Sequence, residues 1–342
     1  MYEFMLEAKY YKKLQDNKVQ CRLCNHFCAL ADGEVGVCHV RKNIKGKLYS
    51  LVYNHPVALN LDPIEKKPLF HFCPGSASFS LGTFGCNFRC KNCQNYEISQ
   101  EAAVEEKVKR LPEITPEQIV QQALDTGAQS IAYTYVEPTI FAEYALDIMK
   151  LARKEGLKNI WVSNGFMSAE FLQDLLPLLD AINIDLKSFE DKFYREVAGG
   201  RLQPVLDNIK TVKQSSTHLE ITTLVIPTLS DDLQMLQKII DFVYTEAGPE
   251  TPWHISRFSG AISWQLKHLP ETDIKLLEKV YQEAKKRGLY YVYLGNVLDK
   301  DKENTYCSQC GALAIRRLGY QVERFDNNGR CSQCGADLNI RC

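Results

Sequence analysis

Short β-branched runs alternate with amphipathic stretches between residues 78 and 297, and this alternation restricts the fold more than any other feature of the chain. It is typical of successive βα units around a parallel sheet. The pattern predicts strands at residues 78–84, 130–135, 159–163, 181–186, 218–226, 252–257 and 290–295, with helices between them. Seven such strands favour an α/β barrel, complete or partial, and a doubly wound open sheet is the alternative.

One helix start is explicit in the sequence. Thr115 precedes Pro116 and Gln118, which gives a threonine cap, a proline at the first helical position and a capping-box glutamine. Gly127 is placed to end the same helix.

Polar and cysteine residues follow the predicted strands. They are Cys86 to Cys93, Glu137 with Pro138, Asn164 with Gly165, Asp185 with Lys187, and His254. Because the carboxyl ends of parallel strands open at the same mouth of a barrel, we expect these side chains to share one face, where active sites are built. A loop cap or turn is the alternative for any one of them taken singly.

The chain of 342 residues carries thirteen cysteines and a net charge of −1. Its first eighteen residues lack the apolar run of a secretory signal, and no stretch of eighteen apolar residues is present to span a membrane. We therefore expect a cytoplasmic protein, in which metal or redox chemistry is a better use of cysteine than disulfides. The near-neutral charge disfavours nucleic acid as a partner.

The central cysteine group consists of Cys86, Cys90 and Cys93. An enclosed zinc site usually takes four protein ligands, and this loop supplies three. A four-iron cluster held by three cysteines keeps one iron without a protein ligand, and a molecule with an amine and a carboxylate can chelate that iron.

Two further groups lie outside the central region. Cys21, Cys24, Cys28 and Cys38 suit either zinc or an auxiliary iron–sulfur cluster, with His26 and His39 as adjacent alternates. The tail repeats Cys-Ser-Gln-Cys-Gly, and there structural zinc is favoured over a redox iron. The tail cysteines are Cys307, Cys310, Cys331 and Cys334, while Cys73 and Cys342 belong to no group.

These groups divide the chain into three predicted parts. Residues 1–70 form a cysteine-rich metal-binding region, 71–297 the barrel, and 298–342 a module that resembles a rubredoxin or zinc ribbon. Both outer parts flank the catalytic units in sequence, so we expect both to frame the barrel mouth.

The spacing Cys86-x-x-x-Cys90-x-x-Cys93 resembles the signature of the radical S-adenosylmethionine (SAM) superfamily, in a loop after the first predicted strand as that fold requires. The resemblance implies a partial (βα)6 barrel, a 4Fe-4S cluster on the three cysteines, and reductive cleavage of SAM to a 5′-deoxyadenosyl radical. Asn92 stands where many members have an aromatic residue. Phe88 and Tyr96 are the candidates to shield the cluster or stack on adenine.

Other motifs resemble those of the pyruvate formate-lyase activating enzymes. Tyr135-Val136-Glu137-Pro138 occupies the place of a glycine-glycine-glutamate-proline element, without its glycines. The resemblance implies that Glu137 pairs with the methionine amino group of SAM, and that Asp185 orders its carboxylate end with Lys187 as countercharge. Ser163-Asn164-Gly165 and His254 also match elements that contact the cosubstrate in that group.

The narrowest resemblance is to the radical enzyme of the AmmeMemoRadiSam system, carried by EKKPLFHFCPGS, GCNFRCKNCQNYEISQ and PWHISRF. It implies Memo-type and AMMECR-type protein partners and an external electron donor such as flavodoxin or ferredoxin. Our leading hypothesis is a radical enzyme that abstracts hydrogen from a partner protein. The alternatives are the same chemistry on a small molecule, and a zinc-dependent scaffold without catalysis.

Overall fold

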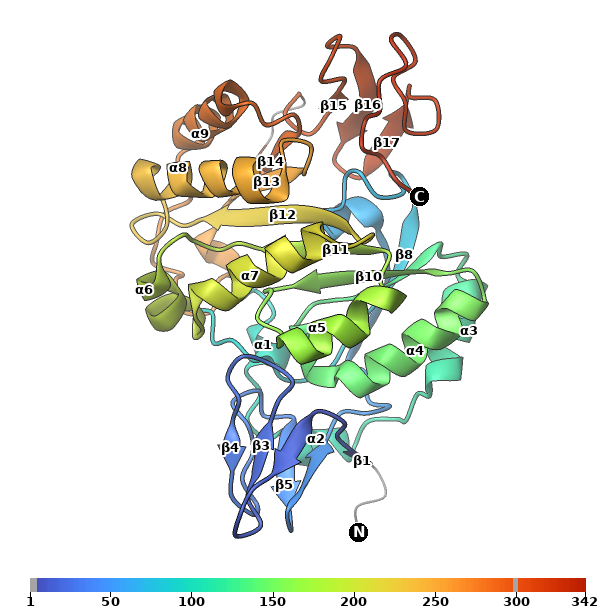
Figure 1. The fold of residues 1–342 in the computed structure, drawn as a ribbon, viewed down its shortest axis with the longest axis vertical. Helices are drawn as coiled ribbons and strands as arrows, with labels where there is room; N and C mark the ends of the chain where they lie inside the picture. Colours follow the sequence, from blue (N-terminus) through green and yellow to red (C-terminus); the bar gives the residue numbers. More distant parts are fainter. Residues whose placement is uncertain (1–4, 298–300) are drawn as a thin grey trace.

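The centre of the computed structural model, which describes residues 5–297 and 301–342, is an eight-stranded sheet (Figure 1). Its strands are β7 (Ala58–Pro63), β8 (Ala77–Gly82), β9 (Ser130–Tyr133), β10 (Lys158–Ser163), β11 (Ala181–Asp185), β12 (His218–Val225), β13 (Trp253–Arg257) and β14 (Val292–Gly295). Strands β8 to β14 are parallel, and β7 pairs antiparallel with β8. All seven predicted strands are confirmed.

Spatial order in this sheet follows chain order from β7 to β14 without a reversal. A doubly wound sheet would reverse its order near the middle, so that alternative is wrong. The sheet has two edges, β7 and β14, and is therefore an open, partial barrel.

Helices alternate with the strands and cover the outer face of the sheet (Figure 1). The main ones are α3 (Pro116–Asp125), α4 (Ala142–Lys154), α5 (Ala169–Leu175), α7 (Leu202–Lys213), α8 (Leu233–Phe242) and α9 (Ile274–Arg287). Shorter turns are α1 (Tyr96–Ser99), α2 (Val104–Val108), α6 (Asp191–Phe193), η1 (Ile64–Lys66), η2 (Pro138–Phe141), η3 (Leu176–Leu178), η4 (Tyr194–Ala198), η5 (Val243–Ala247) and η6 (Gly260–Ile262). Each long helix buries one apolar face, and each fully buried Leu or Ile contributes about 1.5–3 kcal/mol.

The predicted start of α3 is confirmed. The Thr115 hydroxyl accepts from the Gln118 amide, and the Gln118 side chain accepts in return from the Thr115 amide. Gly127 follows the helix with a φ of +69°, the conformation that ends a helix at little cost in glycine.

The N-terminal module contains two small antiparallel sheets. One comprises β1 (Leu6–Glu7), β6 (Lys47–Ser50) and β5 (Arg41–Ile44), and the other β2 (Tyr11–Lys13), β3 (Val19–Cys21) and β4 (Ala29–Leu30). The module contacts the segment after β10, where Asn25 donates to the Phe166 carbonyl and Ser168 to the Leu23 carbonyl. It therefore lies at the carboxyl edge of the barrel. A buried ion pair between Arg41 and Glu143 of α4, 2.5 Å long, adds to this contact.

The C-terminal ribbon contains β15 (Thr305–Tyr306), β16 (Leu313–Leu318) and β17 (Gln321–Arg324). It packs against the loop that precedes β8: Arg317 donates to the Phe70 carbonyl over 2.6 Å, and the Arg341 amide donates to the His71 carbonyl over 2.8 Å. The ribbon therefore lies at the amino edge, and Figure 1 shows it at the end of the molecule opposite the N-terminal module. The expectation that the ribbon frames the mouth is wrong. The predicted boundary at residue 298 lies outside the described residues.

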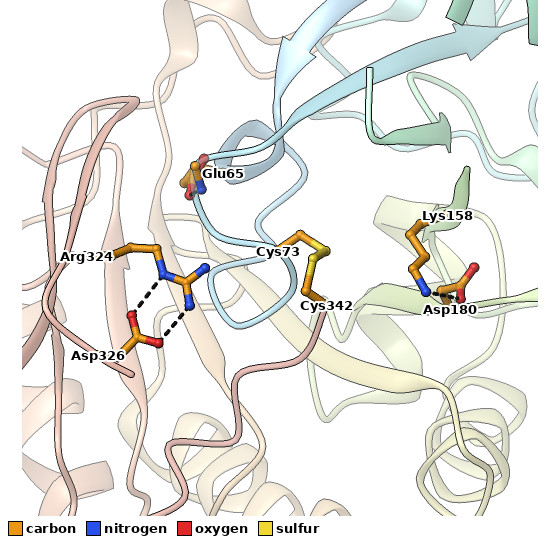
Figure 2. The surroundings of a disulfide bond; sticks show 8 residues. Glu65, Cys73, Lys158, Asp180, Arg324, Asp326 and Cys342 are labelled. Atoms are coloured by element: carbon orange, nitrogen blue, oxygen red, sulfur yellow. Dashed lines mark hydrogen bonds and ion pairs between the residues drawn. A yellow bond between two sulfur atoms is a disulfide. The ribbon is translucent and has the colours of Figure 1, made fainter. Parts of the chain in front are cut away.

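Cys73 and Cys342 form a disulfide, with their Cα atoms 4.6 Å apart (Figure 2). The bond joins residues 269 positions apart and ties the end of the ribbon to the loop before β8. The expectation that the cysteines serve metal or redox chemistry fails for this pair, because the pairing depends on tertiary structure that sequence spacing does not reveal.

Among the helices in the described ranges, none has both the length and the apolar character that crossing a bilayer requires.

We predict that the Cys73–Cys342 bond is recovered from the purified protein. Thiols would be blocked with iodoacetamide, and the digested, unreduced protein analysed by mass spectrometry for the linked peptides. Cys73→Ser should lower the free energy of unfolding by about 2–4 kcal/mol, because the cross-link restricts the unfolded chain. Cys342→Ser is the matched variant, and both differences should vanish in reductant. Complete alkylation of both cysteines in the untreated protein would contradict the assignment.

Candidate active site

The loop Cys86–Cys93 follows β8 at the carboxyl edge, as predicted. Two neighbouring segments hold it there. The Arg89 amide donates to the Ala198 carbonyl of η4 over 2.8 Å, and the Trp264 amide donates to the Cys93 carbonyl over 3.1 Å. These backbone bonds fix the loop from both sides.

The three sulfurs of this loop are spread apart. In the described residues 5–297 and 301–342, the sulfurs of Cys86, Cys90 and Cys93 do not all lie within 4.8 Å of one another. A tetrahedral zinc with Zn–S bonds of about 2.3 Å requires sulfurs about 3.8 Å apart, so the loop suits a polynuclear cluster better than a single ion. Burial raises the pKa of Cys86 and raises that of Cys90 to about 11, so the charge of a bound metal is needed to keep both deprotonated.

Glu137 lies directly after β9, at the amino end of η2, and is 3% exposed. Its carboxylate accepts from Ser163 Oγ over 2.9 Å, from the Asn164 amide over 2.7 Å and from Thr139 Oγ1 over 2.5 Å. Burial raises the pKa of this carboxyl. Protein donors fill the acceptor positions of this carboxylate, so Glu137 is held in place at this edge.

Asn164 is also tied into the protein. Its Nδ2 donates to Asn87 Oδ1 over 2.8 Å, and its Oδ1 accepts from the Phe166 amide over 2.9 Å. Asn87, directly after Cys86, escaped the sequence analysis, and its place inside the cysteine loop was the only available signal. Its Nδ2 is buried and has no hydrogen-bond partner within residues 5–297 and 301–342.

Asp185 and Lys187 form an ion pair, with Nζ 2.6 Å from Oδ2, at the end of β11. The Asp185 side chain is 37% exposed and that of Lys187 is 15% exposed. Burial opposes the charge on Lys187, but Asp185 and Cys90 outweigh it and raise the pKa of the ammonium above its usual range. A lasting positive charge therefore lies beside the loop, next to a carboxylate that solvent can reach.

The backbone conformation of Tyr135 shows how the motif forms without a glycine at this position. It has a φ of +68°, a conformation that glycine adopts without strain and that costs other residues about 1–3 kcal/mol. Its hydroxyl donates to Asp62 over 2.6 Å, the Lys67 ammonium lies 5.0 Å from its ring centre, and its carbonyl accepts from Asn95. These contacts hold the strained residue in the place of a glycine.

The two aromatic candidates differ in exposure. Phe88 is 1% exposed and packs against Phe166 and Tyr194, so it is part of the core and does not reach the mouth. Tyr96 is half-buried and stacks on Trp264, with ring centres 6.4 Å apart. Tyr96 is therefore the candidate that the structure leaves for adenine.

His254 lies within a strand. It is the second residue of β13, so the expectation that it follows a strand is wrong. In the sheet register it pairs with Thr222 of β12, which pairs in turn with Asp185 of β11. Its Nε2 is 2.6 Å from Glu220, a buried carboxylate that also contacts His218 over 3.0 Å and accepts from the Phe70 and His71 amides. His254 thus belongs to a network that supports the loop before β8.

The tail cysteines meet closely. All four sulfurs lie within 4.8 Å of one another, and Cys307–Cys334 and Cys310–Cys331 are each 3.6 Å apart. This spacing matches one tetrahedral ion. The remaining predicted ligands, Cys21, Cys24, Cys28 and Cys38, line a single cavity in the N-terminal module.

Comparison with known proteins agrees with this geometry. The model of the radical SAM superfamily matches residues 81–243. An uncharacterized protein of Methanocaldococcus jannaschii is 44% identical over 313 residues, which cover 92% of each chain. The chain belongs to the radical SAM superfamily.

More distant relatives of this radical SAM protein have named activities. The pyruvate formate-lyase-activating enzyme of Clostridium pasteurianum is 23% identical over 164 residues, which cover 46% of this chain and 66% of that one. Among solved structures, Streptococcus suis SuiB bound to its precursor peptide SuiA aligns with a TM-score of 0.51 at 14% identity, over 68% of this chain and 51% of that one. The second likeness shows the fold.

Membership of the superfamily implies a 4Fe-4S cluster and SAM. Cys86, Cys90 and Cys93 fit that cluster, because they offer three spread sulfurs and because the Phe88 amide lies 3.5 Å from the Cys86 sulfur as a donor. When bound, the cluster supplies the electron for reductive cleavage of SAM. The chain's own residues hold the loop in place and set a cation and a carboxylate beside it.

We predict that His254→Ala destabilises the fold by about 1–3 kcal/mol without changing SAM affinity, because it removes a donor to buried Glu220, whose other partners are His218 and the loop before β8. Chemical denaturation and equilibrium dialysis against SAM would measure the two effects. Asp185→Asn is the matched comparison, with weaker SAM binding and little loss of stability. Weaker SAM binding in His254→Ala at unchanged stability would return His254 to the cosubstrate site.

Glu220 gives the same network a pH dependence. Burial favours its neutral form, but bonds from His218 and His254 prevail and lower its pKa well below the usual 4.5. Its stabilising contribution should therefore be complete above pH 4.5 and decline as the pH falls below that value. Denaturation of wild type and Glu220→Gln across this range should give curves that converge in acid. A gap that stays constant would contradict the assignment.

Proposed function

We propose that this protein cleaves SAM reductively to a 5′-deoxyadenosyl radical and uses the radical to abstract hydrogen from a partner polypeptide. The observation that carries the proposal is the loop Cys86–Cys93 at the carboxyl edge, with the Asp185–Lys187 pair beside Cys90. The three thiolates would hold the cluster, and the charged pair would receive the amino-acid end of SAM.

The charges suit that ligand. The amino-acid end of SAM carries an ammonium and a carboxylate. Lys187 offers a permanent cation to this carboxylate. Asp185, which is paired with Lys187, would help to order the carboxylate end of SAM. Tyr96 on Trp264 offers a flat aromatic face to the adenine ring. Holding SAM at both ends limits where its reactive carbon lies, which a primary alkyl radical requires.

The relatives and the sequence resemblance support a polypeptide target. Several relatives are named as activating enzymes of other proteins, and SuiB was solved with its precursor peptide. The sequence resemblance suggests Memo-type and AMMECR-type proteins as partners, and a flavodoxin or ferredoxin as electron donor.

Since the ribbon lies at the amino edge, the N-terminal module alone would frame the opening. A reducing compartment such as the cytoplasm suits the eleven free cysteines.

We predict that Cys86→Ala, Cys90→Ala and Cys93→Ala each abolish 5′-deoxyadenosine formation, because each removes one of three cluster ligands. Reconstituted protein would be reduced anaerobically with SAM and the product measured by mass spectrometry. Cys310→Ala is the matched control, and it should keep product formation because its site lies in the ribbon at the opposite edge. Full turnover in any of the three central variants would refute the proposal.

A deuterium-labelling experiment would identify the molecule from which the radical abstracts hydrogen. A uniformly deuterated Memo-type or AMMECR-type partner should transfer label into 5′-deoxyadenosine. Label that arrives only from a deuterated metabolite extract, with no partner protein present, would instead identify a small-molecule substrate. Absence of SAM binding, with partner binding intact, would identify a scaffold.

A further inference from the structure

We propose that Cys21, Cys24, Cys28 and Cys38 hold a second iron–sulfur cluster, and that this cluster exchanges electrons with the Cys86–Cys93 site. The first statement is about metal binding and stands on its own. The second rests on the proposed function, because it needs a redox-active cluster on the central loop.

Sulfur spacing separates this group from the zinc-like tail. The tail sulfurs approach to 3.6 Å, as one tetrahedral ion requires. In the part of the chain that the structure describes, no three sulfurs of the N-terminal group lie within 4.8 Å of one another, which is also true of the central loop. In a polynuclear cluster each thiolate binds a different iron, so its sulfurs lie farther apart than around one ion. The N-terminal group therefore resembles the central site.

The four cysteines surround a common space. They line one cavity together with Asn87 and Arg41. Leu23, His26 and Val40 each follow a cysteine of this group by two residues, the position from which the Phe88 amide donates to the Cys86 sulfur. Amide donors to sulfur stabilise thiolate ligands and tune the clusters that they hold.

Arg41 and Asn87, which line this cavity, supply a positive charge and a hydrogen-bond donor. Arg41 is 1% exposed and is held by Glu143, so it places a guanidinium beside thiolates that carry excess negative charge around a metal. Asn87 is 0% exposed and lines the same cavity, and its Nδ2 has no hydrogen-bond partner among the described residues. A cluster sulfur is an acceptor that would satisfy this amide.

The two cysteine sites share a wall. Gly85, directly before Cys86, is packed so closely against Cys38 that an added Cβ would lie 2.4 Å from the Cys38 carbonyl oxygen. On the other side of Cys86, the Asn87 carbonyl lies 2.7 Å from His26 Nε2. Residues on both sides of Cys86 therefore contact the N-terminal group, and the tail ribbon lies at the other edge of the barrel.

Electron transfer between the sites is balanced without other chemistry. A one-electron donor of the flavodoxin or ferredoxin class reduces the N-terminal cluster by one electron. That cluster is reoxidised as the central cluster takes up the same electron, and no bond or proton changes.

The decisive variant removes the central ligands and leaves the proposed ones. The full chain with Cys86, Cys90 and Cys93 all changed to Ala would be reconstituted anaerobically with iron and sulfide. We expect about four iron atoms and a low-temperature EPR signal after dithionite, against about eight iron atoms in wild type. Changing Cys24 and Cys28 to Ser in that variant should remove the remaining iron. A folded central variant without iron, and with zinc above the tail's one equivalent, would overturn the cluster assignment.

Two readouts test the electron route. In Asn87→Leu, loss of the amide donor should shift the midpoint potential of the N-terminal cluster, measured in the central triple-alanine background. The Cys24→Ser/Cys28→Ser variant, with the central cluster intact, should be reduced at least tenfold more slowly by reduced flavodoxin while the small reductant dithionite reduces it as fast as wild type. Equal rates with flavodoxin would overturn the electron exchange and leave SAM cleavage unaffected.

Discussion

The parallel register of β8 to β14 is the constraint on which the site depends. Since every strand runs in the same direction, the loop after β8, the turn after β9 and the end of β11 all lie at one edge. The Cys86–Cys93 loop, Glu137 and Asp185 come from separate parts of the chain and meet there for that reason alone. Backbone bonds from η4 and from Trp264 then fix the loop that the strands have placed.

The two edges of the barrel differ in their contacts and in the role that those contacts suit. At the carboxyl edge, polar groups surround cysteines, and the Asn87 Nδ2 donor has no partner in the part of the chain that the structure describes. At the amino edge, Glu220 accepts from two histidines and two amides, and Arg317 fixes the loop before β8 to the ribbon. The disulfide between Cys73 and Cys342 closes this second edge (Figure 2). The edge that holds the cysteine loop is suited to chemistry, and the edge tied by these bonds and by the disulfide is suited to stability.

Sequence reasoning succeeded where the signal is local. Period and composition predicted all seven parallel strands, and the capping residues predicted the start of α3. It failed where a contact is set by tertiary structure. His254 lies inside both the predicted strand 252–257 and the observed β13, so it does not follow a strand as the other predicted residues do. The partners of Glu137, Asn87 and Cys73 come from distant segments, and no spacing in the sequence marks them.

The outer cysteine groups show the same limit. Four cysteines can hold either zinc or an iron–sulfur cluster, and the distances between their sulfurs distinguish the tail from the N-terminal group. The packing of Gly85 against Cys38 then relates the second group to the catalytic loop, a relation across 47 residues that no motif contains.

The central claim is that a cluster on Cys86, Cys90 and Cys93 binds the amino-acid end of SAM beside Asp185 and Lys187. Pulsed EPR of the reduced protein with SAM labelled by ¹⁵N in its amino group and ¹⁷O in its carboxylate tests this most directly. The account predicts hyperfine coupling of both labels to the cluster, lost in Cys90→Ala. An intact, reduced central cluster that shows no coupling to either label in the presence of saturating SAM would contradict it.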